Sequence, residues 1–294
     1  MRDPVFKFEI PKHSMCVPDG RGGIYALCPK DHIPNHNNES QSGTRPGNSS
    51  NTTRGNRNNP QEDYRLMRYW NRRRYGALIE DALPASSQLF MEKTGGVILL
   101  RRDNDSNFSS LWHLSAPNRR LLLYRGISKH ARVVGDVTGT SVIILTTGGR
   151  LASILTRVAV NREVDGAYTS SIVFSYDLDI PLDAIKDIVD DASDPTRVFL
   201  HCRRRDNSGR NNWKVCRVSS SNDEGVTVED IYICAKNSRV LSDKEHGIWV
   251  WKKPTRDANC ARDRGFVHVK GDSTTWTSPL IFPPGTLLGG LPFR

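Results

Sequence analysis

Short apolar runs separated by polar turns dominate the chain from about residue 86 onward. Examples are GGVILLRR (95–102), TSVIILTT (140–147), TRVFLHCRRR (196–205) and GIWVWKK (247–253), with Gly, Asn, Asp and Pro between the runs. Runs of this length bounded by turn residues are typical of β-strands. The pattern therefore predicts a mainly β body, built as a propeller, a barrel, or a sandwich of the jelly-roll kind.

Two segments have apolar positions spaced as on one face of a helix. Residues 61–76 follow a capping Asn59 and Pro60, and their apolar stripe consists of Leu66, Met67 and Trp70. Residues 181–191 carry a second stripe, made of Leu182, Ile185, Ile188 and Val189. We therefore expect one or two short helices beside the β body.

The front of the chain differs in composition from the rest. Residues 35–60 are almost free of apolar side chains, so they cannot bury enough surface to offset the entropy lost on ordering. The sequence thus predicts an N-terminal segment (1–34), a disordered polar linker (35–60), a basic aromatic helix (61–76) and a β domain (77–294). The linker and the helix together would form a flexible basic arm.

The chain of 294 residues carries a formal net charge of +10, which favours acidic partners such as nucleic acids, anionic glycans or a membrane surface. Residues 1–76 contribute +6 of this excess, from 13 Lys or Arg and 7 Asp or Glu. No apolar run is long enough for a membrane helix, and the N-terminus lacks the apolar block of a signal peptide. One hypothesis is therefore a structural, capsid-like protein that binds single-stranded RNA with phosphate-neutralising arginines and stacking aromatics, namely Arg65, Arg68, Trp70, Arg72, Arg73 and Arg74.

An acidic stretch recurs in the back half of the chain. SYDLD, SNDEGVTV and GDSTTW place aspartates at 177, 223 and 272, which are 46 and 49 residues apart. Each stretch follows two strand-like runs. A period of 40–50 residues is typical of propeller blades, so the back half is expected to consist of similar four-stranded units.

These stretches resemble the Asp box, S-x-D-x-G-x-T-W, of sialidases and related β-propellers. The best copy matches at Ser221, Asp223, Gly225 and Thr227, with Val228 in the aromatic position. The copy around Asp177 lacks the glycine, and in the copy around Asp272 the tryptophan is one residue too close. The resemblance covers residues 136–280 and implies an Asp-box propeller in which Ser221, Asp223, Gly225, Asp177 and Asp272 shape turns and do not act in catalysis.

The resemblance also suggests a ligand. Sialidases hold the substrate carboxylate with three arginines, and the guanidinium fork suits that contact. The strand before the best copy carries Arg203 in the corresponding place, with Arg204 and Arg205 as alternatives. The resemblance implies recognition of anionic glycans such as sialosides, and their hydrolysis if the enzyme machinery is present. The family's catalytic residues cannot be identified by motif, so the catalytic set is unassigned.

Six cysteines allow three disulfides or six thiols. They form no CxxC pair, and the histidines do not cluster at ligand spacings, so no metal or other cofactor is predicted. Cys202 and Cys216 flank the expected hairpin and are the first pair to consider for a disulfide.

Overall fold

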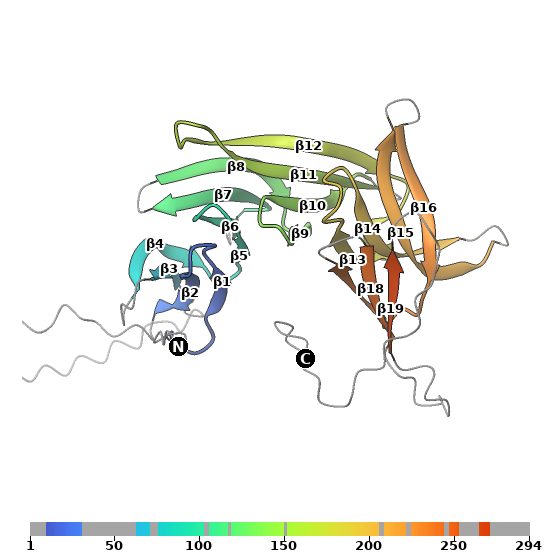
Figure 1. Cartoon of the computed structure of the whole chain (residues 1–294), viewed down its shortest axis with the longest axis horizontal. Helices are drawn as coiled ribbons and strands as arrows, with labels where there is room; N and C mark the ends of the chain where they lie inside the picture. The colour runs from blue at the N-terminus through green and yellow to red at the C-terminus, as the bar shows by residue number, and fades with distance from the viewer. Residues whose placement is uncertain are drawn as a thin grey trace, which may run out of the picture. The chain divides into compact units, whose positions relative to one another are not determined.

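The computed structural model describes residues 10–30, 63–70, 76–102, 106–116, 119–149, 152–205, 209–221, 225–243, 247–252 and 265–270. These residues form five antiparallel sheets, each built from strands that are consecutive in the chain (Figure 1). The first sheet contains β1 (Met15–Pro18), β2 (Ile24–Pro29), β3 (Asp63–Tyr69) and β4 (Ala77–Pro84). The second contains β5 (Gln88–Met91), β6 (Val97–Arg102), β7 (Phe108–Ala116) and β8 (Arg119–Ser128).

The remaining sheets follow the same order. The third contains β9 (Arg132–Gly135), β10 (Ser141–Thr147), β11 (Ser153–Arg162) and β12 (Tyr168–Leu178). The fourth contains β13 (Ile185–Asp190), β14 (Val198–Arg205), β15 (Asn211–Ser221) and β16 (Gly225–Ile233). The fifth contains β17 (Arg239–Asp243), β18 (Gly247–Lys252) and β19 (Gly265–Lys270). The predicted mainly β body of four-stranded units is confirmed, because four of the five sheets have four strands.

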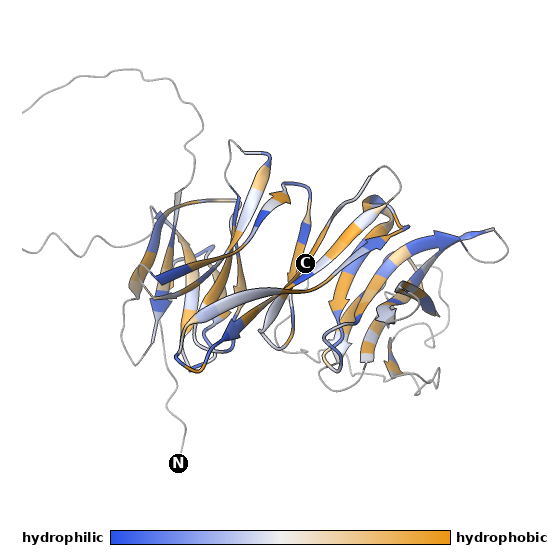
Figure 2. Cartoon of the chain, turned by 90° about the horizontal axis from the view of Figure 1, so that it is seen from above, coloured by the Kyte–Doolittle hydropathy of each residue, from blue (hydrophilic) through white to orange (hydrophobic). Residues whose placement is uncertain are grey.

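The chain divides into two compact units. The first comprises residues 1–129 and 162–169, and the second comprises residues 130–161 and 170–294. Within the first unit, apolar side chains of the first and second sheets share a core around Leu27, Leu66 and Leu99. Within the second unit, one core joins the third and fourth sheets, and another joins the fourth and fifth. Hydrophobic residues lie along the strands, as their hydropathy colouring shows (Figure 2).

The helix predicted over 61–76 is wrong within the described residues, where 63–69 form strand β3 between β2 and β4. Leu66 packs in the core shared with the second sheet, whereas Met67 and Tyr69 belong to a different cluster. Because both faces of this strand are buried, its apolar residues do not alternate with polar ones and resemble a helical stripe. The predicted linker at 35–60 lies outside the described residues.

The helix predicted over 181–191 is also wrong. A single 3-10 turn, η3 (Leu182–Ala184), leads into strand β13. The register of β13 shifts between Ile185 and Asp187, so the buried residues Ile185, Ile188 and Val189 follow the spacing of a helix although they lie on a strand. β-branched side chains also favour the strand. No α-helix occurs in the described residues. These residues therefore contain no helix that is long and apolar enough to cross a membrane.

Of the three predicted Asp-box aspartates, only Asp177 lies among the described residues. Asp177 lies inside strand β12 and is exposed, so the turn predicted there is wrong. Asp223 and Asp272 lie outside the described residues. Ser221 and Gly225 are paired at the ends of β15 and β16, and Gly225 has a φ of 75°, which favours glycine. The Asp-box assignment of this connection stays a prediction.

A different acidic turn recurs, between the first and second strands of a sheet. Asp19 Oδ1 accepts hydrogen bonds from the amides of Arg21 and Gly23, at 2.8 and 2.7 Å. Glu92 accepts from the amides two and four positions on, both at 2.8 Å. Asp136 accepts from the amide four positions on, at 2.9 Å. The carboxylates thus hold the turns that start β2, β6 and β10.

A basic residue of the third strand accompanies each of these turns. Arg68 lies 2.9 Å from Asp19, His113 lies 3.4 Å from Glu92, and Arg157 lies 3.8 Å from Asp136. Each faces the second or third residue of its sheet's second strand. The fourth and fifth sheets have basic residues at the same place, Arg217 and His268. This recurrence identifies the five sheets as variants of one structural unit.

Candidate ligand-binding site

The hairpin of β14 and β15 separates the three arginines predicted to bind substrate. Arg203, Arg204 and Arg205 lie directly opposite Trp213, Asn212 and Asn211. Because successive side chains on a strand point to opposite faces, Arg203 and Arg205 share one face with Trp213, and Arg204 projects from the other. The strand register therefore brings two of the three predicted arginines together.

Arg203, Trp213 and Lys236 form what we call the Trp213 cluster. Arg203 and Lys236 are exposed and Trp213 is half-buried. The Lys236 ammonium lies 6.0 Å from the centre of the indole ring, at the limit of a cation–π contact. Within the described residues, Arg203 has no carboxylate partner. As far as the described part of the chain shows, the cluster presents positive charge around an aromatic ring without an internal anion to neutralise it.

The buried side chain of His201 packs against the indole ring of Trp213. His201 lies edge-on to Trp213, with ring centres 5.2 Å apart and an interplanar angle of 66°. Its Nδ1 is 3.3 Å from Asp187 Oδ2, on the directly opposite residue of β13. Burial opposes the charged form of Asp187, but the hydrogen bond with His201 and the charge of Lys186 outweigh it and lower the pKa of Asp187. The Trp213 indole thus packs against His201, and the imidazole of His201 contacts the Asp187 carboxylate.

Arg204 has a structural role on the other face. Its Nη1 lies 2.9 Å from Asp230 Oδ1 and donates to the carbonyl of Val228 at 3.3 Å. Burial opposes the charged form of Asp230, but hydrogen bonds from Lys214 and Cys216 and the charge of Arg204 outweigh burial and lower the pKa of Asp230. Because Arg204 is committed to this ion pair, we exclude it from the candidate site.

The residues predicted to bind RNA lie partly in strand β3. Arg65 Nε is 3.0 Å from Asp81 Oδ1. Arg68 pairs with Asp19 and also lies over two aromatic rings, 5.3 Å from Tyr25 and 5.4 Å from Trp70. The structure thus brings Arg68 and Trp70 together within the first sheet. Three further predicted residues, Arg72, Arg73 and Arg74, lie outside the described residues.

Sequence reasoning missed Trp213, His201 and Lys236. The apolar run NWKVCRVSS (212–220) contains Trp213 and predicts a strand. What the sequence could not supply was the register that sets Trp213 opposite Arg203, or the course of the chain that returns Lys236 to the indole. A cross-strand alignment of β14 with β15 would have been the only available signal.

Two hollows among the described residues of the second unit are lined by other side chains than the predicted arginines. One, of about 340 Å³, is lined by His130, Arg132 and Asp183 among others. Another, of about 100 Å³, contains Arg157 in contact with Asp190, and burial raises the pKa of that carboxyl. Among the described residues, no group of three or more His, Cys, Asp or Glu side chains could hold a metal ion.

Comparison with known proteins gives a fold and no family. No family model matches the sequence, and no curated protein matches it. The β-propeller domain of the trilobed protease from Pyrococcus furiosus, described as having an open velcro topology, is similar in structure. The likeness has a TM-score of 0.50 at 8% identity and covers 91% of this chain and 71% of that one. Together with the consecutive four-stranded sheets, it shows that this protein has a mainly β, propeller-like fold.

Proposed function

We propose that this protein is a propeller-like recognition protein that binds anionic glycans, with sialosides as the leading class, through the Trp213 cluster. The observation that carries the proposal is the exposed Arg203 directly opposite Trp213, with Lys236 over the same ring. An arginine fork pairs well with a carboxylate, and an aromatic ring offers an apolar surface to the C–H groups of a sugar. Arg205, exposed on the same face, adds a further cation.

The proposal agrees with the sequence resemblance at one residue. Arg203 was the position corresponding to a carboxylate-binding arginine of sialidases, and it is the arginine of the three that faces an aromatic side chain. The proposal is limited to recognition, because hydrolysis needs a nucleophile and an acid/base that the sequence does not identify. We assign no catalytic residue.

RNA binding is the competing function, and the contacts of the first sheet weigh against its described residues. Arg65 and Arg68 each have a carboxylate partner, so a phosphate would have to displace that partner. Arg203 has no carboxylate partner to displace among the residues that the structure describes. The same experiment can compare the two ligands.

The test measures binding of the full chain to polysialic acid, heparin and oligo(U) at several salt concentrations. Arg203→Ala should weaken polysialic acid binding about tenfold, the effect of one charge-assisted hydrogen bond. Arg125→Ala is the matched control, because it removes the same charge from an exposed position in the other unit. It should leave affinity within about twofold, since surface charge acts weakly at a distance in salt.

Two results would contradict the proposal. One is absence of binding to any acidic glycan by the wild-type chain. The other is equal weakening by the Arg203 and Arg125 variants, which would indicate a general effect of net charge. Preference for oligo(U) over both glycans would favour the RNA hypothesis. Turnover of a fluorogenic sialoside, lost in Arg203→Ala, would extend the proposal from recognition to hydrolysis.

A further inference from the structure

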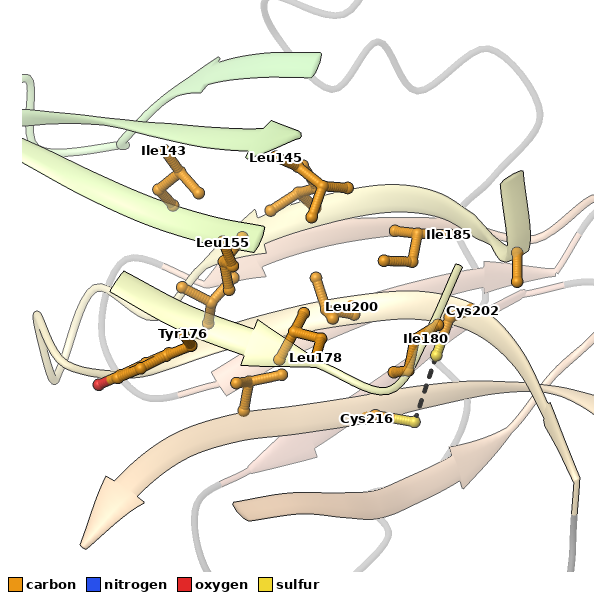
Figure 3. Close-up of a cluster of buried hydrophobic side chains, with 14 of the residues drawn as sticks. Ile143, Leu145, Leu155, Tyr176, Leu178, Ile180, Ile185, Leu200, Cys202 and Cys216 are labelled. Atoms are coloured by element: carbon orange, nitrogen blue, oxygen red, sulfur yellow. Dashed lines mark hydrogen bonds between the residues drawn. The ribbon is translucent and has the colours of Figure 1, made fainter. Parts of the chain in front are cut away.

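Two thiols lie in contact inside the hairpin that carries the Trp213 cluster. Cys202 on β14 and Cys216 on β15 are both fully buried, and their Sγ atoms are 3.5 Å apart (Figure 3). They are diagonal neighbours, because Cys202 faces Lys214 and Cys216 faces Leu200 across the hairpin. Both side chains lie in the apolar core between the third and fourth sheets, beside Ile180 (Figure 3).

Polar groups border this pair on one side. Cys216 Sγ lies 3.4 Å from Asp230 Oδ1, a carboxylate that also contacts Lys214 and Arg204. Two cations and a proton acceptor therefore adjoin a pair of thiols that is otherwise enclosed by apolar side chains. Cations close to a thiol favour its thiolate, which is the reactive form.

The two thiols are electrostatically unequal. The hydrogen bond between the two thiols lowers the pKa of Cys202 against the opposing effect of burial, and the charges of Arg204 and Lys214 act in the same direction. The same hydrogen bond and burial both raise the pKa of Cys216 well above its ordinary value. Cys216 Sγ also lies 3.4 Å from the negatively charged Asp230 carboxylate, which disfavours a thiolate at Cys216, so we assign Cys202 as the attacking thiol.

We propose that Cys202 and Cys216 form a reversible thiol–disulfide site whose oxidant is a small hydroperoxide. The Cys202 thiolate attacks one peroxide oxygen and the O–O bond breaks. With hydrogen peroxide the products after protonation are a sulfenic acid and water, and with an alkyl hydroperoxide they are a sulfenic acid and an alcohol. The Cys216 sulfur then attacks the sulfenic sulfur, an S–S bond forms, and a second water leaves. In sum, two thiols and one hydrogen peroxide give one disulfide and two waters. A dithiol reductant reverses the step.

The geometry requires little movement. A disulfide has an S–S distance of about 2.04 Å, so the sulfurs must approach by about 1.5 Å from their separation of 3.5 Å. The bond would join the two strands on which Arg203 and Trp213 face each other. A small oxidant is specified because both sulfurs are buried and a bulky disulfide reagent has no access to them.

The experiment uses the full, folded chain and needs no variant. The protein is treated with hydrogen peroxide and quenched with catalase, its remaining thiols are blocked with N-ethylmaleimide after denaturation, and it is digested with trypsin. The expected product is a linked pair of peptides, VFLHCR (198–203) and VCR (215–217). Its mass is about 2 Da below the sum of the two thiol peptides, and it disappears after treatment with dithiothreitol.

Cys16, which is exposed, reports whether peroxide has reached the protein. If Cys16 is oxidised while peptides 198–203 and 215–217 carry only the maleimide, the proposal is overturned. Oxidation of either cysteine to a sulfinic or sulfonic acid without the link also overturns it.

Two variants test the order of the reaction. In Cys216→Ser, peroxide should leave a sulfenic acid on Cys202 that reacts with dimedone, because no second thiol resolves it. In Cys202→Ser, Cys216 should label at least several-fold less. Equal dimedone labelling of the two variants, both folded by circular dichroism, would overturn the assignment of Cys202 as the attacking thiol.

Discussion

The first and fourth sheets each place an arginine beside a tryptophan, and the two clusters differ in what neutralises the arginine. Arg68 lies between Tyr25 and Trp70 and is paired with Asp19, whose carboxylate is almost fully buried. Arg203 lies opposite Trp213 on an exposed face without such a carboxylate among the described residues. An arginine beside an aromatic ring is therefore not sufficient evidence for a ligand site. The proposed site differs because its arginine has no carboxylate partner among the described residues.

The same difference separates a structural repeat from a local feature. The Asp19–Arg68 contact has counterparts in the second and third sheets, at Glu92 and Asp136. The Trp213 cluster belongs to the fourth sheet. A contact that recurs in successive sheets supports the fold, whereas the function is expected where one sheet departs from its neighbours.

The largest loss of stability should follow from replacing Arg68, the cation that pairs with the buried Asp19 carboxylate. Arg68→Ala leaves the Asp19 carboxylate buried and unpaired, so the free energy of unfolding should fall by about 4 kcal/mol. Urea denaturation measures this. Arg203→Ala is the control and should change stability by less than about 0.5 kcal/mol, because its side chain is exposed. Equal losses would remove the distinction between the two clusters.

Acid should weaken the turn that Glu92 holds at the start of β6. Burial opposes the charged form of Glu92, but hydrogen bonds from His113, Thr94 and Gly96 outweigh it and lower the pKa of Glu92 to about 2, from an ordinary value of 4.5. A lowered folded-state pKa means that this group stabilises the fold above about pH 4.5 and loses that contribution as the pH falls towards 2. At neutral pH the contribution corresponds to about 3 kcal/mol.

Glu92→Gln should therefore be less stable by about 3 kcal/mol at neutral pH, and its stability should change less between about pH 5 and pH 2. Unfolding monitored by circular dichroism across this range measures both quantities. Glycan binding by the folded variant should be unchanged, since Glu92 lies outside the Trp213 cluster. If the free energy of unfolding of the wild-type protein did not change between about pH 5 and pH 2, the ionised Glu92 carboxylate would not stabilise the turn.

Trp213→Ala should weaken binding of polysialic acid about tenfold, because stacking on an aromatic side chain contributes on the order of 1 kcal/mol or more. Trp70→Ala is the matched control, and it should lower stability with affinity unchanged in the folded fraction. Isothermal titration calorimetry gives the affinities. If the Trp70 variant lost affinity instead, the first sheet would be the ligand site.

The smallest effect should come from Lys236. Lys236→Gln removes one cation near the indole and should weaken binding about threefold, in keeping with an exposed cation–π contact. The salt dependence of binding should also become shallower. Lys129→Gln, at an exposed position of the first unit, is the control and should change neither quantity.

The sequence predicted the β architecture correctly, but it misassigned two strands as helices and misplaced an acidic turn. The strand-like runs and their turn residues were sufficient for a body of four-stranded units, because apolar runs and turn chemistry are local properties. The helices predicted over 61–76 and 181–191 became β3 and β13, since strands buried on both faces or shifted by a bulge share the spacing of a helix. Recurring acidic turns were predicted at Asp177, Asp223 and Asp272. Asp177 lies inside a strand, the other two lie outside the described residues, and acidic turns are found instead at Asp19, Glu92 and Asp136.

The candidate site was only partly predictable, because the packing of the β14–β15 hairpin depends on residues far away in the sequence. The sequence identified three adjacent arginines and a hairpin with two cysteines, and alternation alone implied that Arg204 would face away from Arg203 and Arg205. The sequence did not show which face of the β14–β15 hairpin would be exposed or which face would contact Asp230.

Local sequence patterns were sufficient to predict most of the strands, the excess of positive charge and the side chains that can bind an anion. The tertiary structure alone decided that Arg68 would be neutralised by Asp19, that Arg203 would face Trp213, and that Cys202 would touch Cys216. Backbone periodicity depends on neighbours in the chain, whereas strand register and the packing of one sheet on another depend on residues far away in sequence.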